Sequence, residues 1–180
     1  KRMLAGEDVR IMINMPPRHG KSDMATQKFP SWVLGKSPDI PVMTSSYSSD
    51  LATDFGQSTR DIMQSPAYSA MFKTRLREDA KAKGKWLTKE GGGYVAVGVG
   101  GALTGKGFKI GIIDDPFKNR EEADSETIRD SRHKWYQSTF YTRQEGATMI
   151  VFILTRWHED DLAGRVLQDA EEAKERGEPY

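Results

Sequence analysis

One stretch decides the fold: Met15-Pro16-Pro17-Arg18-His19-Gly20-Lys21-Ser22, which directly follows an apolar, strand-like run that starts at Val9. A strand, a loop that ends in Gly-Lys-Ser and a helix together form a phosphate-binding loop, whose backbone N–H groups surround a polyphosphate. In such a loop Lys21 reaches the outer phosphate oxygens and the Ser22 hydroxyl binds Mg²⁺. We therefore expect a nucleotide to contact six consecutive residues: Pro17, Arg18, His19, Gly20, Lys21 and Ser22.

A second signal is needed, because Met15 stands where the pattern G-x-x-x-x-G-K-[ST] has its first glycine. Further along the chain, an apolar strand at residues 109–113 ends in Asp114 and Asp115. Strands disfavour Asp and adjacent carboxylates repel each other, so the pair calls for a ligand such as a magnesium nucleotide. Asp114 would then hold Mg²⁺, and Asp115 would orient and deprotonate the attacking water. The structural alternative is a strand that ends in a turn at Pro116, with both acids in water.

Three further side chains are candidates for contact with the γ-phosphate. Thr155 and Arg156 follow an apolar strand at residues 148–154. The carboxyl ends of parallel strands meet at one edge of a sheet, where ligands bind. Thr155 would sense the γ-phosphate and Arg156 would respond to the change in charge on hydrolysis, although a surface turn is a competing interpretation for Arg156. Arg18 lies inside the loop, where a cation either stabilises the transferring phosphoryl group or pairs with a carboxylate.

Two basic features of the sequence each allow two interpretations. Lys106 lies in the glycine-rich segment 98–107, where an exposed cation either acts as a finger on a neighbouring subunit's nucleotide or is simply solvated. Residues 73–89 hold seven Lys or Arg side chains and two acidic ones. Such a run either follows a nucleic-acid backbone or forms a solvated face of the protein.

Composition limits the class of protein. The 180 residues suffice for one domain with a sizeable core, and a net charge of +1 argues neither for nor against a nucleic-acid partner. The chain has no cysteine, which excludes disulfides, a thiolate nucleophile and a cysteine-based zinc site. No apolar run approaches the ~18–20 residues of a membrane span, so we expect no membrane partner.

The order of the expected elements predicts an α/β fold with a mainly parallel sheet that helices cover on both faces. The main strands are expected at residues 9–15, 41–45, 109–113 and 148–154. The main helices are expected at residues 20–34, 48–63, 124–141 and 159–176. The first helix is expected to be closed by Gly35. A β-hairpin is predicted where Gly91-Gly92-Gly93 separates two short apolar runs.

Taken in this order, the motifs closely resemble the ATPase domain of tailed-phage terminase large subunits, the motors that package viral DNA. The segments that carry the resemblance are Pro16–Ser22, Leu103–Gly107, Ile113–Pro116 and Thr155–Leu162. The resemblance implies a P-loop NTPase of the additional-strand (ASCE) class, with the strand before Thr155 inserted between the other two strands of the site. It also implies that Lys21 and Ser22 are the Walker A residues, Asp114 the Walker B residue and Thr155 the start of a coupling motif. The family usually has Glu where Asp115 stands.

The resemblance further implies cofactors, partners and a location. ATP and Mg²⁺ would be bound, and the partners would be double-stranded DNA, the portal protein, the small terminase subunit and the nuclease domain of the parent protein. The motor would be a homo-oligomeric ring at the procapsid portal in the host cell cytoplasm, whereas this piece alone can be a monomer. We expect residues 1–180 to form a single ATPase domain, a fragment without the C-terminal nuclease, since nothing after Leu162 has that nuclease's pattern of clustered acids.

The expected function is therefore Mg²⁺-dependent ATP hydrolysis that moves double-stranded viral DNA into a procapsid, without nuclease activity in this chain. Two other interpretations stay open. A helicase-like translocase would need a second ATPase-like domain or helicase motifs, and neither is visible in this length. A DNA-binding or scaffold module with a degenerate nucleotide site is favoured by Met15, by the short carboxylate of Asp115 and by the truncation that we expect.

Overall fold

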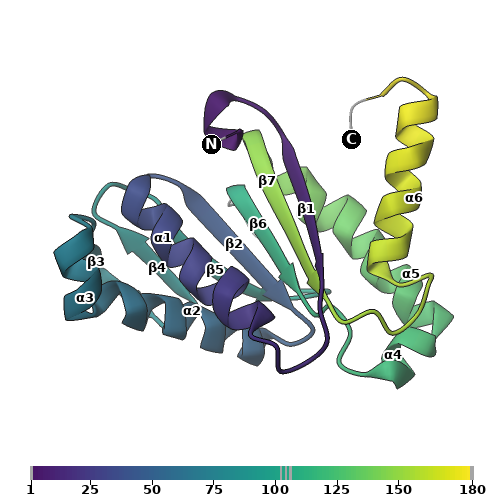
Figure 1. Cartoon of the computed structure of the whole chain (residues 1–180), viewed down its shortest axis with the longest axis horizontal. Coiled ribbons are helices and arrows are strands. Elements are labelled where there is room, and N and C mark those ends of the chain that lie inside the picture. The colour runs from purple at the N-terminus through teal and green to yellow at the C-terminus, as the bar shows by residue number, and fades with distance from the viewer. Residues whose placement is uncertain (1, 102, 104, 106, 179–180) are drawn as a thin grey trace.

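The computed structural model describes residues 2–101, 103, 105 and 107–178, and a mixed sheet of seven strands lies at its centre (Figure 1). In spatial order the strands are β1 (Val9–Asn14), β7 (Gln144–Leu154), β6 (Phe108–Asp114), β2 (Pro41–Ser46), β5 (Gly93–Gly98), β4 (Lys85–Thr88) and β3 (Leu76–Ala82). The first five are parallel to one another, and β4 and β3 are added antiparallel. The α/β fold class is confirmed.

The position of β7 is the part of this topology that builds the site. It lies between β1 and β6, as the additional-strand class requires. Asn14 is paired with Leu154, and Ile153 with Asp114, so the carboxyl ends of three neighbouring strands lie level. The segments that follow these strands therefore meet at one edge of the sheet.

Helices cover both faces of the sheet. They are η1 (Met3–Ala5), the π-helical η2 (Asp23–Lys28), α1 (Phe29–Lys36), α2 (Ser49–Gln64), α3 (Pro66–Met71), α4 (Arg120–Asp124), α5 (Glu126–Trp135), η3 (Tyr136–Phe140), η4 (Tyr141–Arg143) and α6 (Leu162–Glu175). Figure 1 shows α1 and α2 to the left of the central strands and α5 and α6 to the right. None of the helices in the described ranges is long and apolar enough to cross a membrane.

Two apolar cores lie on opposite faces of the sheet, and neighbouring residues of one strand alternate between them. Ile112 belongs to the core that includes Leu34 of α1, whereas Ile113 belongs to the core that includes Trp135 of α5 and Ala163 of α6. Side chains of a strand point alternately to its two faces, so this alternation identifies the face toward which each strand residue points. The central strands are thus buried on both sides, which is typical of parallel sheets.

The expected elements are present with a few differences. The hairpin around the glycines is confirmed as β4 and β5, and the basic run at 73–89 forms the antiparallel edge of the sheet. The expectation that Gly35 closes the first helix is wrong, because α1 continues to Lys36. A Cβ atom at position 35 would lie 2.6 Å from the ring of Phe72, so glycine is needed there for close packing instead.

Candidate active site

The loop between β1 and the following helix has the curled backbone of an anion-binding loop. Arg18 and Gly20 have positive φ values of 63° and 77°, and such alternation of backbone conformation turns successive N–H groups in one direction. The helix begins at Lys21, directly after this curl. Among the described non-glycine residues only Arg18 and Asp115 have positive φ, so Met15 adopts an ordinary conformation. The loop therefore does not need a glycine at position 15.

The Lys21 side chain contacts residues that follow three neighbouring strands. Its side chain is only 5% exposed, and its Nζ donates to the Asp115 carboxylate over 2.7 Å. The same Nζ donates to the Oγ1 of Thr155, and it lies 3.5 Å from the carbonyl oxygen of Met15. Lys21 follows β1, Asp115 follows β6 and Thr155 follows β7. The structure thus brings together three of the side chains that the sequence predicted for the site.

Asp115 is oriented by its backbone as well as by Lys21. Its φ of 43° is rare for a residue other than glycine and marks a sharp turn at the end of β6. The carboxylate also accepts a hydrogen bond from the backbone N–H of Thr155 over 2.7 Å. Its side chain is 29% exposed, so water can reach it while Lys21 beside it is buried. These contacts give Asp115 one orientation at the mouth of the site.

Asp114 points to the opposite side of β6 and is buried. Its Oδ2 accepts a hydrogen bond of 2.5 Å from the hydroxyl of Thr26, and its Oδ1 has no partner among the described residues. Burial raises the pKa of Asp114 to about 6, against the opposing effect of hydrogen bonds from Thr26 and Ser22. The nearby charge of Asp115 also raises this pKa, whereas Lys21 lowers it. A buried carboxylate oxygen without a partner is unfavourable unless a ligand satisfies it.

Ser22 and Asp114 fit a Mg²⁺ ion that is shared with a ligand. Ser22 is half-buried at the start of the helix, close enough to Asp114 to lower the pKa of its carboxyl. Within the described ranges no group of three or more His, Cys, Asp or Glu side chains could hold a metal by itself. Mg²⁺ is usually bound by one or two protein oxygens together with waters and phosphates, rather than by a protein cage. Asp114, whose Oδ1 has no partner among the described residues, and the nearby Ser22 match this requirement.

Arg156 lies in the loop after β7 and is held there by other contacts. Its Nε donates to the Asp161 carboxylate over 2.8 Å, and its guanidinium also donates to the Glu159 carbonyl over 2.9 Å. Asp161 is buried and caps α6 by accepting from the N–H of Gly164. These contacts favour the structural interpretation of Arg156, in which it fixes the loop that follows Thr155.

Three other predicted residues lie on the exposed rim of the site. Pro17, Arg18 and His19 are exposed on the loop, and the His19 ring contacts the Pro17 carbonyl at 2.9 Å. The proposed finger Lys106 lies outside the described residues. Its role, like that of Arg18, stays a prediction.

Two features of the site were missed from the sequence. Thr26 follows Ser22 by four residues, so helical spacing could have identified it as a neighbour of the same ligand. Asp160 accepts hydrogen bonds of 2.9 Å from both Arg129 of α5 and Arg165 of α6. The Arg165 guanidinium lowers the pKa of Asp160 to about 2, with a further contribution from Arg129. This ion network attaches the loop after Thr155 to two helices.

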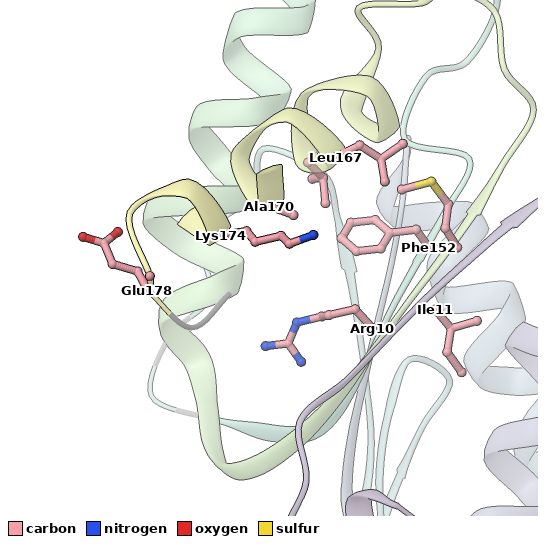
Figure 2. Close-up of a pocket in the computed structure, with 10 residues that line it drawn as sticks. Arg10, Ile11, Phe152, Leu167, Ala170, Lys174 and Glu178 are labelled. Atoms are coloured by element: carbon pink, nitrogen blue, oxygen red, sulfur yellow. The ribbon is translucent and has the colours of Figure 1, made fainter. Parts of the chain in front are cut away.

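A separate groove of about 520 Å³ lies between β1 and α6 (Figure 2). Figure 2 shows Phe152 and Leu167 at its apolar wall, with Arg10 and Lys174 pointing in from two sides. The Arg10 guanidinium is already bound to the Gln144 side chain over 2.6 Å. The groove brings together none of the hydroxyl and carboxylate groups that meet at the strand ends, so the candidate active site is the edge around Lys21.

Comparison with known proteins agrees with the fold. Residues 12–180 match the family model described as terminase large subunit, T4likevirus-type, N-terminal. The structure resembles the crystal structure of the HK97 bacteriophage large terminase with a TM-score of 0.60 and 16% sequence identity, over 96% of this chain and 34% of that one. The chain therefore spans about a third of that terminase, and at this identity the likeness concerns the fold alone. No curated protein matches the sequence.

Proposed function

Because the chain belongs to the family of terminase large subunit N-terminal domains of the T4likevirus type, we propose that it is a Mg²⁺-dependent ATPase that powers the packaging of phage DNA. One observation carries the proposal: Lys21, Asp115 and Thr155 meet at the level ends of three neighbouring parallel strands. The Lys21 cation contacts both the Asp115 carboxylate and the Thr155 hydroxyl, and such groups can neutralise charge and orient a water in phosphoryl transfer.

Lys21 and Asp115 would act by exchanging partners. The Lys21 ammonium lies 2.7 Å from the Asp115 carboxylate. A γ-phosphate is also an anion, so it would compete with this carboxylate for Lys21. Once Lys21 binds the phosphate, the Asp115 carboxylate is free to orient a water and accept its proton. The N–H of Thr155 keeps that carboxylate in place during the exchange. When bound, Mg²⁺ would neutralise charge on the phosphates, held by Ser22 and Asp114.

Thr155 would link hydrolysis to motion. Its hydroxyl contacts Lys21 and its backbone N–H contacts Asp115, so it responds to both groups that change partners. The loop that follows is attached through Asp160 to Arg129 and Arg165 on two helices. A shift of Thr155 would therefore move the loop together with α5 and α6, and we place the coupling to DNA there. Arg18 stays a candidate for the cation that stabilises the transferred phosphoryl group.

The partners belong to the same proposal. Double-stranded DNA would be the substrate that is moved, and the portal protein, the small terminase subunit and the nuclease domain of a parent protein would be its neighbours. The motor would be a ring of copies at the procapsid portal in the host cytoplasm, with residues 1–180 as one ATPase domain and a monomer in isolation. Lys106 would be the finger that reaches a neighbouring nucleotide.

The geometry argues against a degenerate nucleotide site. Met15 has an ordinary backbone conformation, so the missing glycine does not distort the loop. Asp115, although shorter than Glu, reaches Lys21 at hydrogen-bond distance. Two of the sequence features that favour a scaffold module, Met15 and the short carboxylate of Asp115, are therefore compatible with a working site.

Steady-state ATP hydrolysis with Mg²⁺, with and without double-stranded DNA, tests the proposal. Lys21→Ala should abolish turnover while circular dichroism shows that the protein stays folded. Lys28→Ala is the matched control, because this lysine lies further along the same helix, is 63% exposed and pairs with Asp23 at the surface. Wild-type turnover that survives Lys21→Ala would refute the assignment of the site.

A further inference from the structure

Ser46 is the last residue of β2 and lies beside the proposed metal site. β2 is parallel to β6, and Ser46 is paired in register with Asp114. Paired residues of parallel strands point to the same face of a sheet. The Asp114 carboxylate reaches Thr26 of η2, so the Ser46 side chain also points to the helix face of the phosphate-binding loop.

Both side chains have an oxygen without a partner. Ser46 is fully buried, and its Oγ has no hydrogen-bond partner among the described residues. The Oδ1 of Asp114 is equally buried and equally without a partner. A buried, unsatisfied polar atom is unfavourable in a folded protein, and two such atoms that point to the same face from paired positions can share one ligand.

The strands on either side of Ser46 offer its hydroxyl one polar side chain, that of Asp114. The residue paired with Ser46 on its other side is Gly98 of β5, which has no side chain to offer. A Cβ atom at position 98 would lie 2.8 Å from the backbone nitrogen of Ser49, so the start of α2 closes that side of the sheet. The carboxylate of Asp114 is thus the polar side chain next to Ser46 across the parallel strands.

We propose that Ser46 is a positioning residue of the Mg²⁺ site, whose hydroxyl and the free Oδ1 of Asp114 together hold one water that belongs to the metal. The proposal rests on the Mg²⁺–nucleotide site proposed above. A hydroxyl can donate and accept at once, so Ser46 can bind a water that also donates to the carboxylate. Mg²⁺ keeps several of its waters in protein sites, and the groups that orient them tune its affinity.

The neighbouring Ser45 provides a matched control. It is also a fully buried serine without a hydrogen-bond partner among the described residues. Its register partner is Ile113, whose side chain lies in the core under α5 and α6. Ser45 therefore has the same chemistry and burial as Ser46 but faces away from Asp114.

Calorimetric titration of the chain with ADP tests the role, once with Mg²⁺ and once with EDTA. Ser46→Ala should weaken binding about tenfold with Mg²⁺ and leave binding in EDTA unchanged, because outer-shell groups affect the metal and not the nucleotide. Ser46→Cys keeps the side-chain volume with a poor hydrogen-bonding group, so it should behave like Ser46→Ala. Ser45→Ala should bind like the wild type in both buffers.

Thermal unfolding separates this role from a structural one. Ser46→Ala removes an unsatisfied buried hydroxyl, so its Tm should equal or exceed that of the wild type. A lower Tm together with equal losses in Mg²⁺ and EDTA would overturn the proposal in favour of a packing role.

Asp114→Asn separates the two proposals. If Asp114→Asn weakens Mg²⁺–ADP binding and Ser46→Ala does not, the role of Ser46 is overturned while the nucleotide site stands. If the wild type gains no affinity from Mg²⁺, the metal site itself is overturned, and the role of Ser46 with it.

Discussion

Replacing Asp115 by Ala should destabilise the free chain more than replacing its partner Lys21 by Met. Removing one partner of a fully buried ion pair costs ~3–5 kcal/mol, because an uncompensated charge stays in the protein. Lys21 keeps the Thr155 hydroxyl and the Met15 carbonyl as neighbours, and Asp115 is 29% exposed. We therefore expect about half the buried value, ~2 kcal/mol, for Asp115→Ala.

The reverse change leaves a better-solvated charge behind. Without Lys21, the Asp115 carboxylate keeps the Thr155 N–H at 2.7 Å and its access to water. Lys21→Met should therefore cost ~1 kcal/mol or less. The double variant Asp115→Ala/Lys21→Met leaves neither charge unpaired, so it should be more stable than Asp115→Ala alone, with a coupling energy above ~1 kcal/mol.

Urea unfolding of the nucleotide-free chain, followed by circular dichroism, measures these differences. Lys28→Ala serves as a control for the loss of a lysine, since its surface pair with Asp23 should contribute less than ~0.5 kcal/mol. If Asp115→Ala were no less stable than Lys21→Met, or if the two changes were additive, the ion pair would not have the energetic role given to it.

Three further changes have expected outcomes. Burial raises the pKa of Asp114 to about 6, so the folded chain retains a proton that the unfolded chain, with a pKa near 3.8, releases. Rising pH between these values should lower the free energy of unfolding by up to ~3 kcal/mol, and urea titrations of Asp114→Asn should lose this slope. The Arg165 guanidinium lowers the pKa of Asp160 to about 2, so its stabilising effect is present above pH ~4 and is lost as pH falls toward 2. Asp160→Asn should cost ~1 kcal/mol at pH 7 in urea unfolding, because its side chain is 39% exposed and screened by water. Gly35→Ala places a methyl group 2.6 Å from the Phe72 ring, and thermal unfolding should give a loss of ~1–3 kcal/mol.

The sequence was sufficient to predict that three side chains of the candidate site lie close together. Lys21, Asp115 and Thr155 each follow an apolar strand, and the level ends of parallel strands placed them together. The insertion of β7 between β1 and β6 followed from the family resemblance and is confirmed by the order of the strands in the sheet. These inferences succeeded because each rests on a local pattern and a general rule of topology.

The remaining features depend on register and packing, which a single sequence does not display. Ser46 stands beside Asp114 only because β2 and β6 pair in one register, and nothing local to residue 46 indicates this. Gly35 has the position of a helix-ending glycine, but the approach of Phe72 explains it instead. Arg156 was a candidate sensor from its place after a strand, whereas its contacts to Asp161 and Glu159 depend on how the loop folds back.

Hydrolysis and binding of ATP by Asp115→Asn, beside the wild type and with Mg²⁺, test the central claim most directly. The substitution keeps the size of the side chain and removes its ability to accept a proton. The rate of phosphate release should fall about a hundredfold or more. The affinity for ATP should stay within a few fold of the wild type or increase, because the Asp115 carboxylate no longer competes with the phosphate for Lys21. Undiminished phosphate release by Asp115→Asn would contradict the account, because the carboxylate at the end of β6 would then not be the group that activates water.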